Sequence, residues 1–145
     1  MYFPDLSSYE YGPLAFPCPV AFNVGWLDVS ESFSSGPVCE GFLEKLGFMV
    51  ESPINVTRGA HLCAFCLVEV QSKCGEKMNG MLMVQSVERL GGLGNGEIVV
   101  KGEGGVCYFA PVLIYHYVEK HEYQPPDEFV DAVLRGDDNS GNLPE

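Results

Sequence analysis

The sequence predicts a single α+β domain: a small, mainly antiparallel sheet with two or three helices and a zinc-knuckle-like loop. Its 145 residues suit one hydrophobic core. Residues 97–110 are typical of two strands joined by a glycine-rich turn, and two other segments repeat their apolar residues at helical spacing behind a proline. The predicted domain covers residues 1–136, and residues 137–145 are expected to form a flexible acidic tail.

The N-terminal half predicts one extended segment and one short helix. Residues 20–29, VAFNVGWLDV, are typical of an extended segment, and Trp26 is expected to anchor it in the core. Pro37 suits the first turn of a helix, and apolar residues recur at helical spacing behind it. We therefore expect a helix over residues 37–47.

The middle of the chain predicts strands. Residues 67–72, LVEVQS, alternate apolar and polar side chains as a half-buried strand does. Residues 81–90, MLMVQSVERL, fit neither period, and the glycines on both sides favour a strand. A hairpin with its turn at Glu103–Gly105 follows, in which the neighbouring side chains of Cys107 and Tyr108 should face opposite sides of the sheet.

Two helices are predicted near the C-terminus. The first runs from Pro111 to Tyr123, and its apolar residues share one side with His121. The second begins at Pro126, carries acidic residues in its first turn and ends before Gly136. Both are expected to pack on the sheet.

The stretch RGAHLCAFC, residues 58–66, holds one histidine and two cysteines within six positions. The two-residue interval between Cys63 and Cys66 lets adjacent thiolates bind one zinc ion without straining the loop. Downstream, four residues separate His116 from His121, an interval within the range of zinc-finger histidines. Together these side chains make a zinc-binding set of two thiolates and two imidazoles.

Three histidines compete for two places in this set. His121 lies on the apolar side of its helix, whereas the helical rotation places His116 about 140° away. Both can bind one ion only if the last turn of the helix loosens, and the segment before Pro125 permits this. If the helix stays regular, His61 replaces one of them. The choice of four ligands stays open among His61, Cys63, Cys66, His116 and His121.

Other kinds of site could use the same residues. A redox pair of the thioredoxin kind lies at a helix start beside a βαβ pattern, which is not evident around Cys63. Unrelated buried cysteines and surface histidines are the plainest alternative. A catalytic zinc needs an open position and a base such as Glu69, Glu119 or Glu122, but the histidine interval is not that of zinc proteases. Structural zinc is favoured, and no catalytic residue is assigned.

Charge and targeting signals limit the partners. Twenty acidic residues against eight basic ones give a net charge of -12. Such a charge repels phosphate backbones, so direct nucleic-acid binding is not expected, whereas a protein partner with a basic face would be attracted. The N-terminus lacks the basic residues of a secretory signal, and no apolar run approaches the about 20 residues that cross a bilayer. We expect a cytoplasmic protein that does not bind membranes.

The remaining motifs carry no predicted chemistry. The glycine-rich stretch GGLGNG, residues 91–96, lacks the Lys-Ser/Thr of a phosphate-binding loop and predicts a turn. In a reducing compartment thiols rarely form structural disulfides. Six cysteines are an even number, which leaves a disulfide framework open, but the missing secretory signal weighs against it, and Cys18, Cys39, Cys74 and Cys107 are treated as incidental thiols.

Four blocks of the sequence resemble a family of small, largely uncharacterised bacterial proteins. They are NVGWLD (residues 23–28), RGAHLCAFC (58–66), GNGEIVV (94–100) and APVLIYHYVEKHEYQPPDEFVDAV (110–133). The resemblance implies a shared metal site at the five candidate ligands, and it implies no particular reaction.

Two functions are consistent with these features. The favoured one is a non-enzymatic protein-binding module, of the immunity or defence-associated kind, in which structural zinc maintains the shape of a binding surface. The alternative is a zinc-dependent hydrolase of a small-molecule substrate, in which three ligands hold the ion and a carboxylate activates water.

Overall fold

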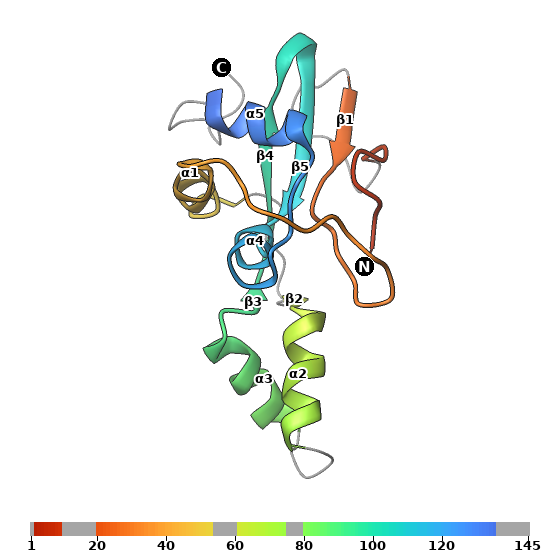
Figure 1. The fold of residues 1–145 in the computed structure, drawn as a ribbon, viewed down its shortest axis with the longest axis vertical. Coiled ribbons are helices and arrows are strands. Elements are labelled where there is room, and N and C mark those ends of the chain that lie inside the picture. The colour runs from red at the N-terminus through yellow and green to blue at the C-terminus, as the bar shows by residue number, and fades with distance from the viewer. Residues whose placement is uncertain (1, 10–19, 54–60, 75–79, 136–145) are drawn as a thin grey trace.

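The computed structural model describes residues 2–9, 20–53, 61–74 and 80–135. Their fold is α+β, as the sequence predicts, and it has two parts (Figure 1). The part that we call the body contains a three-stranded sheet and three helices. The part that we call the arm, residues 61–74 and 80–94, contains two helices and a short two-stranded ribbon, and it projects from one end of the body.

The sheet of the body consists of β1 (Val20–Asn23), β4 (Glu97–Lys101) and β5 (Val106–Pro111), in the order β1-β5-β4. Strands β4 and β5 form the predicted antiparallel hairpin, with Val100 opposite Tyr108. A turn of 3-10 helix at Glu103–Gly105 joins them. Strand β1 pairs with β5 in parallel, so the sheet is mixed, while the β4–β5 hairpin and the two-stranded ribbon of the arm are antiparallel.

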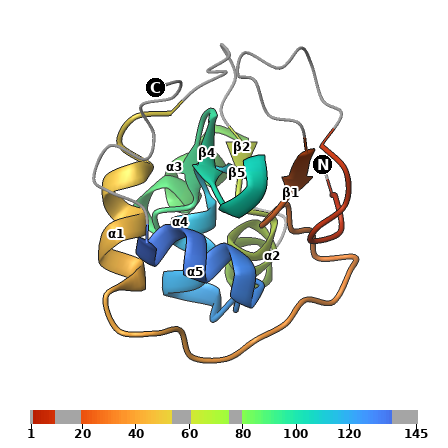
Figure 2. The ribbon, with the colours of Figure 1, turned by 90° about the horizontal axis from the view of Figure 1, so that it is seen from above.

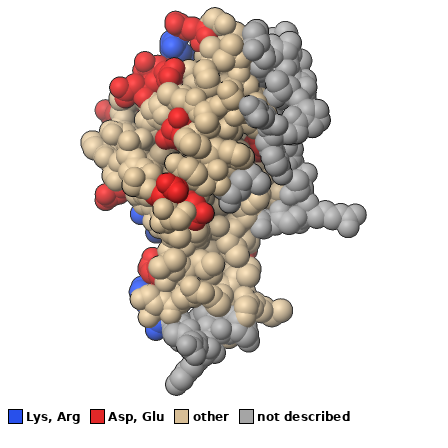
Figure 3. Space-filling model, turned by 90° about the vertical axis from the view of Figure 1, so that its right-hand side faces the viewer, with Lys and Arg blue, Asp and Glu red and all other residues tan. Residues whose placement is uncertain are grey.

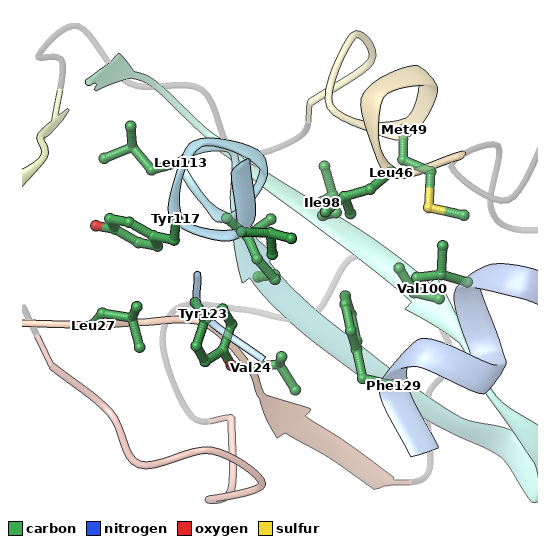
Figure 4. Close-up of a cluster of buried hydrophobic side chains, with 14 of the residues drawn as sticks. Val24, Leu27, Leu46, Met49, Ile98, Val100, Leu113, Tyr117, Tyr123 and Phe129 are labelled. Carbon is green, nitrogen blue, oxygen red and sulfur yellow. The ribbon is translucent and has the colours of Figure 1, made fainter. Parts of the chain in front are cut away.

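Helices α1 (Phe42–Met49), α4 (Ile114–His121) and α5 (Asp127–Arg135) lie on one side of this sheet (Figure 2). Between helices and sheet lies the main core, which Figure 4 shows in part. Alternate residues of the hairpin enter it, as the pleat of a strand requires. The fully or almost fully buried side chains at its centre include Phe42, Leu46, Val100, Ile114, Tyr123 and Phe129.

The opposite face of the sheet is covered by the N-terminal segment. There Tyr9 stacks on Phe109 with ring centroids 3.9 Å apart, and the hydroxyl of Tyr9 donates a hydrogen bond to the buried Glu97. Cys107 belongs to this second cluster while Tyr108 belongs to the main core, which confirms that the two face opposite sides. Trp26 is buried as predicted, and its Nε1–H donates to the carbonyl of Phe109.

Cys107 corrects one prediction. It is disulfide-bonded rather than an incidental thiol, and its partner is not among the side chains that the structure describes. Cys39 is a free and exposed thiol. The expectation that the thiol of Cys107 stays reduced is therefore wrong.

The arm consists of β2 (His61–Leu62), α2 (Ala64–Cys74), α3 (Gly80–Arg89) and β3 (Leu93–Gly94), with β2 and β3 antiparallel. The two strands predicted over residues 67–72 and 81–90 are therefore helices. In α2 the buried residues Cys66 and Val70 are four apart, which is helical spacing, while Val68 is half exposed. The exposed Val68 and the buried Val70 lie two residues apart. The sequence therefore alternates apolar and polar residues as a strand does, although the segment is helical.

The other predicted boundaries shift by a few residues. Helix α1 begins at Phe42 rather than Pro37, because Gly41 before it has a left-handed φ of 87°. Pro111 is the last residue of β5, and α4 begins three residues later. The predicted tail at residues 137–145 lies outside the described residues. Among the helices of the described segments, none has the length and apolar character to span a bilayer.

Candidate metal centre

Four side chains from the arm and the body meet at the junction between these parts. The ligand atoms of Cys63, Cys66, His116 and His121 all lie within 4.8 Å of one another. The two cysteines come from the start of α2 and the two histidines from α4. His61, the fifth candidate, lies exposed on β2 and does not belong to the group.

The cysteines are held in a tight knuckle. Cys63 lies between β2 and α2, and its N–H donates to the carbonyl of Gly92 at 2.7 Å. The backbone N–H of Cys66 points to the Sγ of Cys63 at 3.5 Å. This hydrogen bond positions the sulfur of Cys63 against the first turn of α2, which carries Cys66.

The end of α4 brings the histidines together. Glu122, just after the helix, has a left-handed φ of 59°, and its N–H donates to the carbonyl of Tyr117, five residues back. A regular helix would use the carbonyl four residues back, so the last turn is widened. The Nε2 atoms of His116 and His121 consequently lie 3.2 Å apart. The sequence anticipated this loosening as the condition for both histidines to share one ion.

Four of the six distances between the ligand atoms match the edges of a tetrahedron around zinc. Bonds of about 2.3 Å to sulfur and about 2.0–2.1 Å to nitrogen place a sulfur and a nitrogen about 3.5 Å apart, and two nitrogens about 3.3 Å apart. The three S···N distances are 3.4 Å for Cys63 to His121, 3.2 Å for Cys66 to His116 and 3.5 Å for Cys66 to His121. All four observed edges therefore fall within about 0.3 Å of the ideal values.

Burial favours the neutral forms of all four groups. It raises the pKa of Cys63, and it raises the pKa of Cys66 to about 12 with help from the nearby Cys63. It also lowers the pKa of His121, and lowers the pKa of His116 to about 4 with help from His121. A divalent cation reverses this for the thiols, because a coordinating thiol is deprotonated. Two thiolates then balance the charge of Zn²⁺ at a buried place.

Two glycines that sequence reasoning assigned to a turn also pack against this site. A Cβ on Gly92 would lie 2.9 Å from Val87 and 3.0 Å from the Cβ of Cys63. Gly91 has a left-handed φ of 82°, and a Cβ there would lie 3.4 Å from Nδ1 of His116. That nitrogen is buried and has no hydrogen-bond partner among the described residues. The doublet GG at 91–92 was the only signal in the sequence, and it does not distinguish a turn from close packing.

Aromatic side chains enclose the histidines. The ring of Phe65, between the two cysteines, lies 5.1 Å from the ring of His121 and 5.9 Å from that of Tyr117. Phe65 also packs against Phe33 of the body. The same short segment thus supplies two ligand atoms and an apolar contact across the junction.

The comparisons with known proteins give a family and no activity. A family model described as "Domain of unknown function (DUF7919)" matches residues 1–134, so the chain belongs to this family. The comparison with curated proteins and the comparison with solved structures each found no match.

Proposed function

We propose that this member of the DUF7919 family binds one zinc ion through Cys63, Cys66, His116 and His121, and that the ion is structural. The observation that carries the proposal is that four of the six distances between the two sulfurs and two nitrogens match a tetrahedral zinc shell, while all four atoms lie within 4.8 Å of one another. Zinc suits this mixture of thiolate and imidazole ligands in tetrahedral geometry.

Four protein ligands also bear on the choice between structure and catalysis. A catalytic zinc keeps one position for water and has three protein ligands, whereas structural sites are closed. Here the fourth corner is supplied by protein, so the geometry supports a structural ion over a hydrolase. The ion would join the start of α2 to α4, and so hold the arm to the body.

Metal analysis and X-ray absorption test this proposal. Purified protein should contain one zinc per chain, with two sulfurs at about 2.3 Å and two nitrogens at about 2.0–2.1 Å. The exchange Cys39→Ser, at an exposed thiol, should leave the zinc content unchanged, whereas Cys63→Ser should lower it. An oxygen ligand in place of a sulfur or nitrogen would contradict the closed site, and protein without metal would contradict the proposal itself.

We further propose that the body binds a protein partner with a basic face. The described residues of the body include thirteen acidic and four basic side chains, whereas the arm has two of each. Acidic side chains gather on the wide upper part of the molecule in Figure 3. Such a field attracts a basic surface and raises its rate of association.

Paired variants of equal charge test the partner proposal. The exchange Glu44→Gln with Asp131→Asn removes two exposed charges from helices α1 and α5 of the body, which pack together. The exchange Glu69→Gln with Glu88→Gln removes two exposed charges from the arm. Capture of a partner from the native host should weaken for the first pair and at about 0.5 M salt. Equal effects of both pairs, or indifference to salt, would contradict the proposal.

A further inference from the structure

A small cavity lies beside the metal centre, where three distant segments of the chain meet. It has a volume of about 80 Å³. Its walls come from residues 26–28 of the body, residues 61–64 at the start of the arm, and residues 111–117 at the end of β5 and the start of α4. By volume it can hold about three water molecules, or a ligand of a few non-hydrogen atoms.

The lining is apolar except for three side chains. Six of its nine residues are apolar, among them Trp26 and Leu113, and the polar ones are Asp28, His61 and Tyr117. Asp28 is the one carboxylate, and neither lysine nor arginine takes part. An apolar pocket with a few convergent polar groups is the usual form of a small-ligand site, and here its formal charge is negative.

The carboxylate retains hydrogen-bonding capacity. Its Oδ1 accepts a hydrogen bond from the N–H of Val29 at 2.6 Å. Within the described part of the chain, Oδ2 of Asp28 has no hydrogen-bond partner, although the side chain is half buried. Oδ2 is not among the buried oxygens without a partner, so it is open to solvent, and a bound cation can take the place of water there.

Tyr117 brings a second polar group to the cavity. Its ring is buried and is held by Phe65, while Figure 4 shows its hydroxyl directed away from the neighbouring core side chains, near Leu113. A tyrosine hydroxyl is protonated at neutral pH and can act as both donor and acceptor. It can therefore accept one hydrogen bond from a ligand while donating another.

We propose that this cavity binds a small organic ammonium ion, with Asp28 as its counter-ion and with Trp26 and Tyr117 as aromatic walls. Aromatic side chains attract such cations through their negative ring faces, and a carboxylate within an apolar lining adds direct charge pairing. His61, an exposed residue of the lining, offers a ring nitrogen for a hydrogen bond with the ion. An anion would meet the Asp28 charge with no cationic side chain in the lining to balance it.

Titration of the metal-loaded protein with methylammonium and tetramethylammonium chloride tests the proposal. Amide NMR signals of residues 26–28, 61–64 and 111–117 should shift together and saturate, while sodium acetate at the same ionic strength should leave them in place. Equal responses to acetate, or shifts spread over the whole surface, would overturn the proposal.

Two charge-matched variants separate the local carboxylate from the net charge. Asp28→Asn keeps the oxygen that accepts from Val29 and should weaken binding of the preferred cation by about tenfold or more. Glu31→Gln removes an exposed acid three residues away and should change it by less than about twofold. If the two variants behave alike, the Asp28 site is wrong.

A third variant keeps the test open if Asp28→Asn fails to fold. Tyr117→Phe removes only the hydroxyl and should weaken methylammonium, which has N–H donors, more than tetramethylammonium, which has none. Equal weakening of both ions would exclude the hydroxyl from binding and contradict its place in the proposal. Zinc content is measured in every sample, so loss of cation binding at full zinc content leaves the metal proposal intact.

Discussion

Helix α5 of the body and helix α3 of the arm are almost equal in length, but they bury very different amounts of apolar surface. Helix α5 buries Phe129, Val130, Ala132 and Val133. In α3, Val87 is the one buried residue, and Met81 is 72% exposed. The main core therefore lies in the body, and the arm, which projects from it (Figure 1), adds only Cys63, Cys66, Val70 and Val87 to its buried residues.

The contrast indicates what holds the arm in place. Helices of 10 or 11 residues are marginal in water unless they pack against other elements. The buried residues at the start of α2 are Cys63, Cys66 and Val70, while Phe65 and Leu67 are partly buried against the core, and α2 also packs against α3. Two of these five residues are proposed zinc ligands. In the arm, a metal ion would thus replace much of the hydrophobic core that stabilises the body.

The largest expected effect comes from removing the metal. In the double variant Cys63→Ser with Cys66→Ser, zinc is lost and the arm should unfold, since binding energy at a structural zinc site is folding energy. Amide hydrogen exchange should become fast throughout α2 and α3 and stay slow in β4 and β5. Slow exchange in α2 of a zinc-free variant would show that the arm is stable without the ion.

The next largest effect belongs to the body. Phe129 is fully buried and packs edge to face against Phe42 and Tyr108. Phe129→Ala should lower the free energy of unfolding by about 3–5 kcal/mol, measured by denaturant titration. The matched exchange Phe48→Ala, at a side chain that is 60% exposed, should cost less than about 1 kcal/mol. Similar losses in both variants would contradict the core described for the body.

A smaller effect is expected where Gly92 packs against Cys63, within the arm. Gly92→Ala should lower the stability of zinc-loaded protein by about 1–3 kcal/mol, because its Cβ would press on Cys63 and Val87. It should also weaken zinc affinity in competition with a chelator. Gly80→Ala is the control, since a Cβ at the start of α3 meets nothing within 4 Å. Unchanged zinc affinity in Gly92→Ala would mean that the knuckle adapts to the added methyl group.

The smallest effect belongs to the ion pair on the arm. Lys73 and Glu69 lie 3.1 Å apart one helical turn from each other, with side chains 72% and 46% exposed. Lys73→Gln should change the free energy of unfolding by less than about 0.5 kcal/mol, because water and salt screen the pair. A loss above 1 kcal/mol in thermal unfolding would mean that surface charge contributes to the stability of the arm.

The difference between body and arm also explains which elements the sequence predicted correctly and which it did not. The β4–β5 hairpin and helix α5 were predicted because their apolar residues follow the period of the element and are buried accordingly. Helices α2 and α3 were taken for strands because several apolar side chains, such as Val68 and Met81, face solvent. Periodicity reports helical structure only when the apolar face is the buried face.

The candidate site was predicted in its residue types but not in its final membership. Thiolates two residues apart and histidines five positions apart indicated zinc without any coordinates. His61 does not join the metal ligands because it lies exposed on the two-residue strand β2. No local sequence pattern predicts which way its side chain points. The packing of Gly91 depends on His116 of α4, more than 20 residues later in the chain, and that of Gly92 depends on Cys63, more than 20 residues earlier.

The widened end of α4 makes the count of residues between the histidines part of the site. One inserted residue would rotate the second imidazole by about 100° and advance it by about 1.5 Å, far more than a metal–ligand bond can absorb. By contrast, the 49 residues between Cys66 and His116 include exposed turns such as Glu103–Gly105, which can change length without moving a ligand. Relatives that keep the ion should therefore conserve the first interval strictly, and insertions and deletions should accumulate in the second.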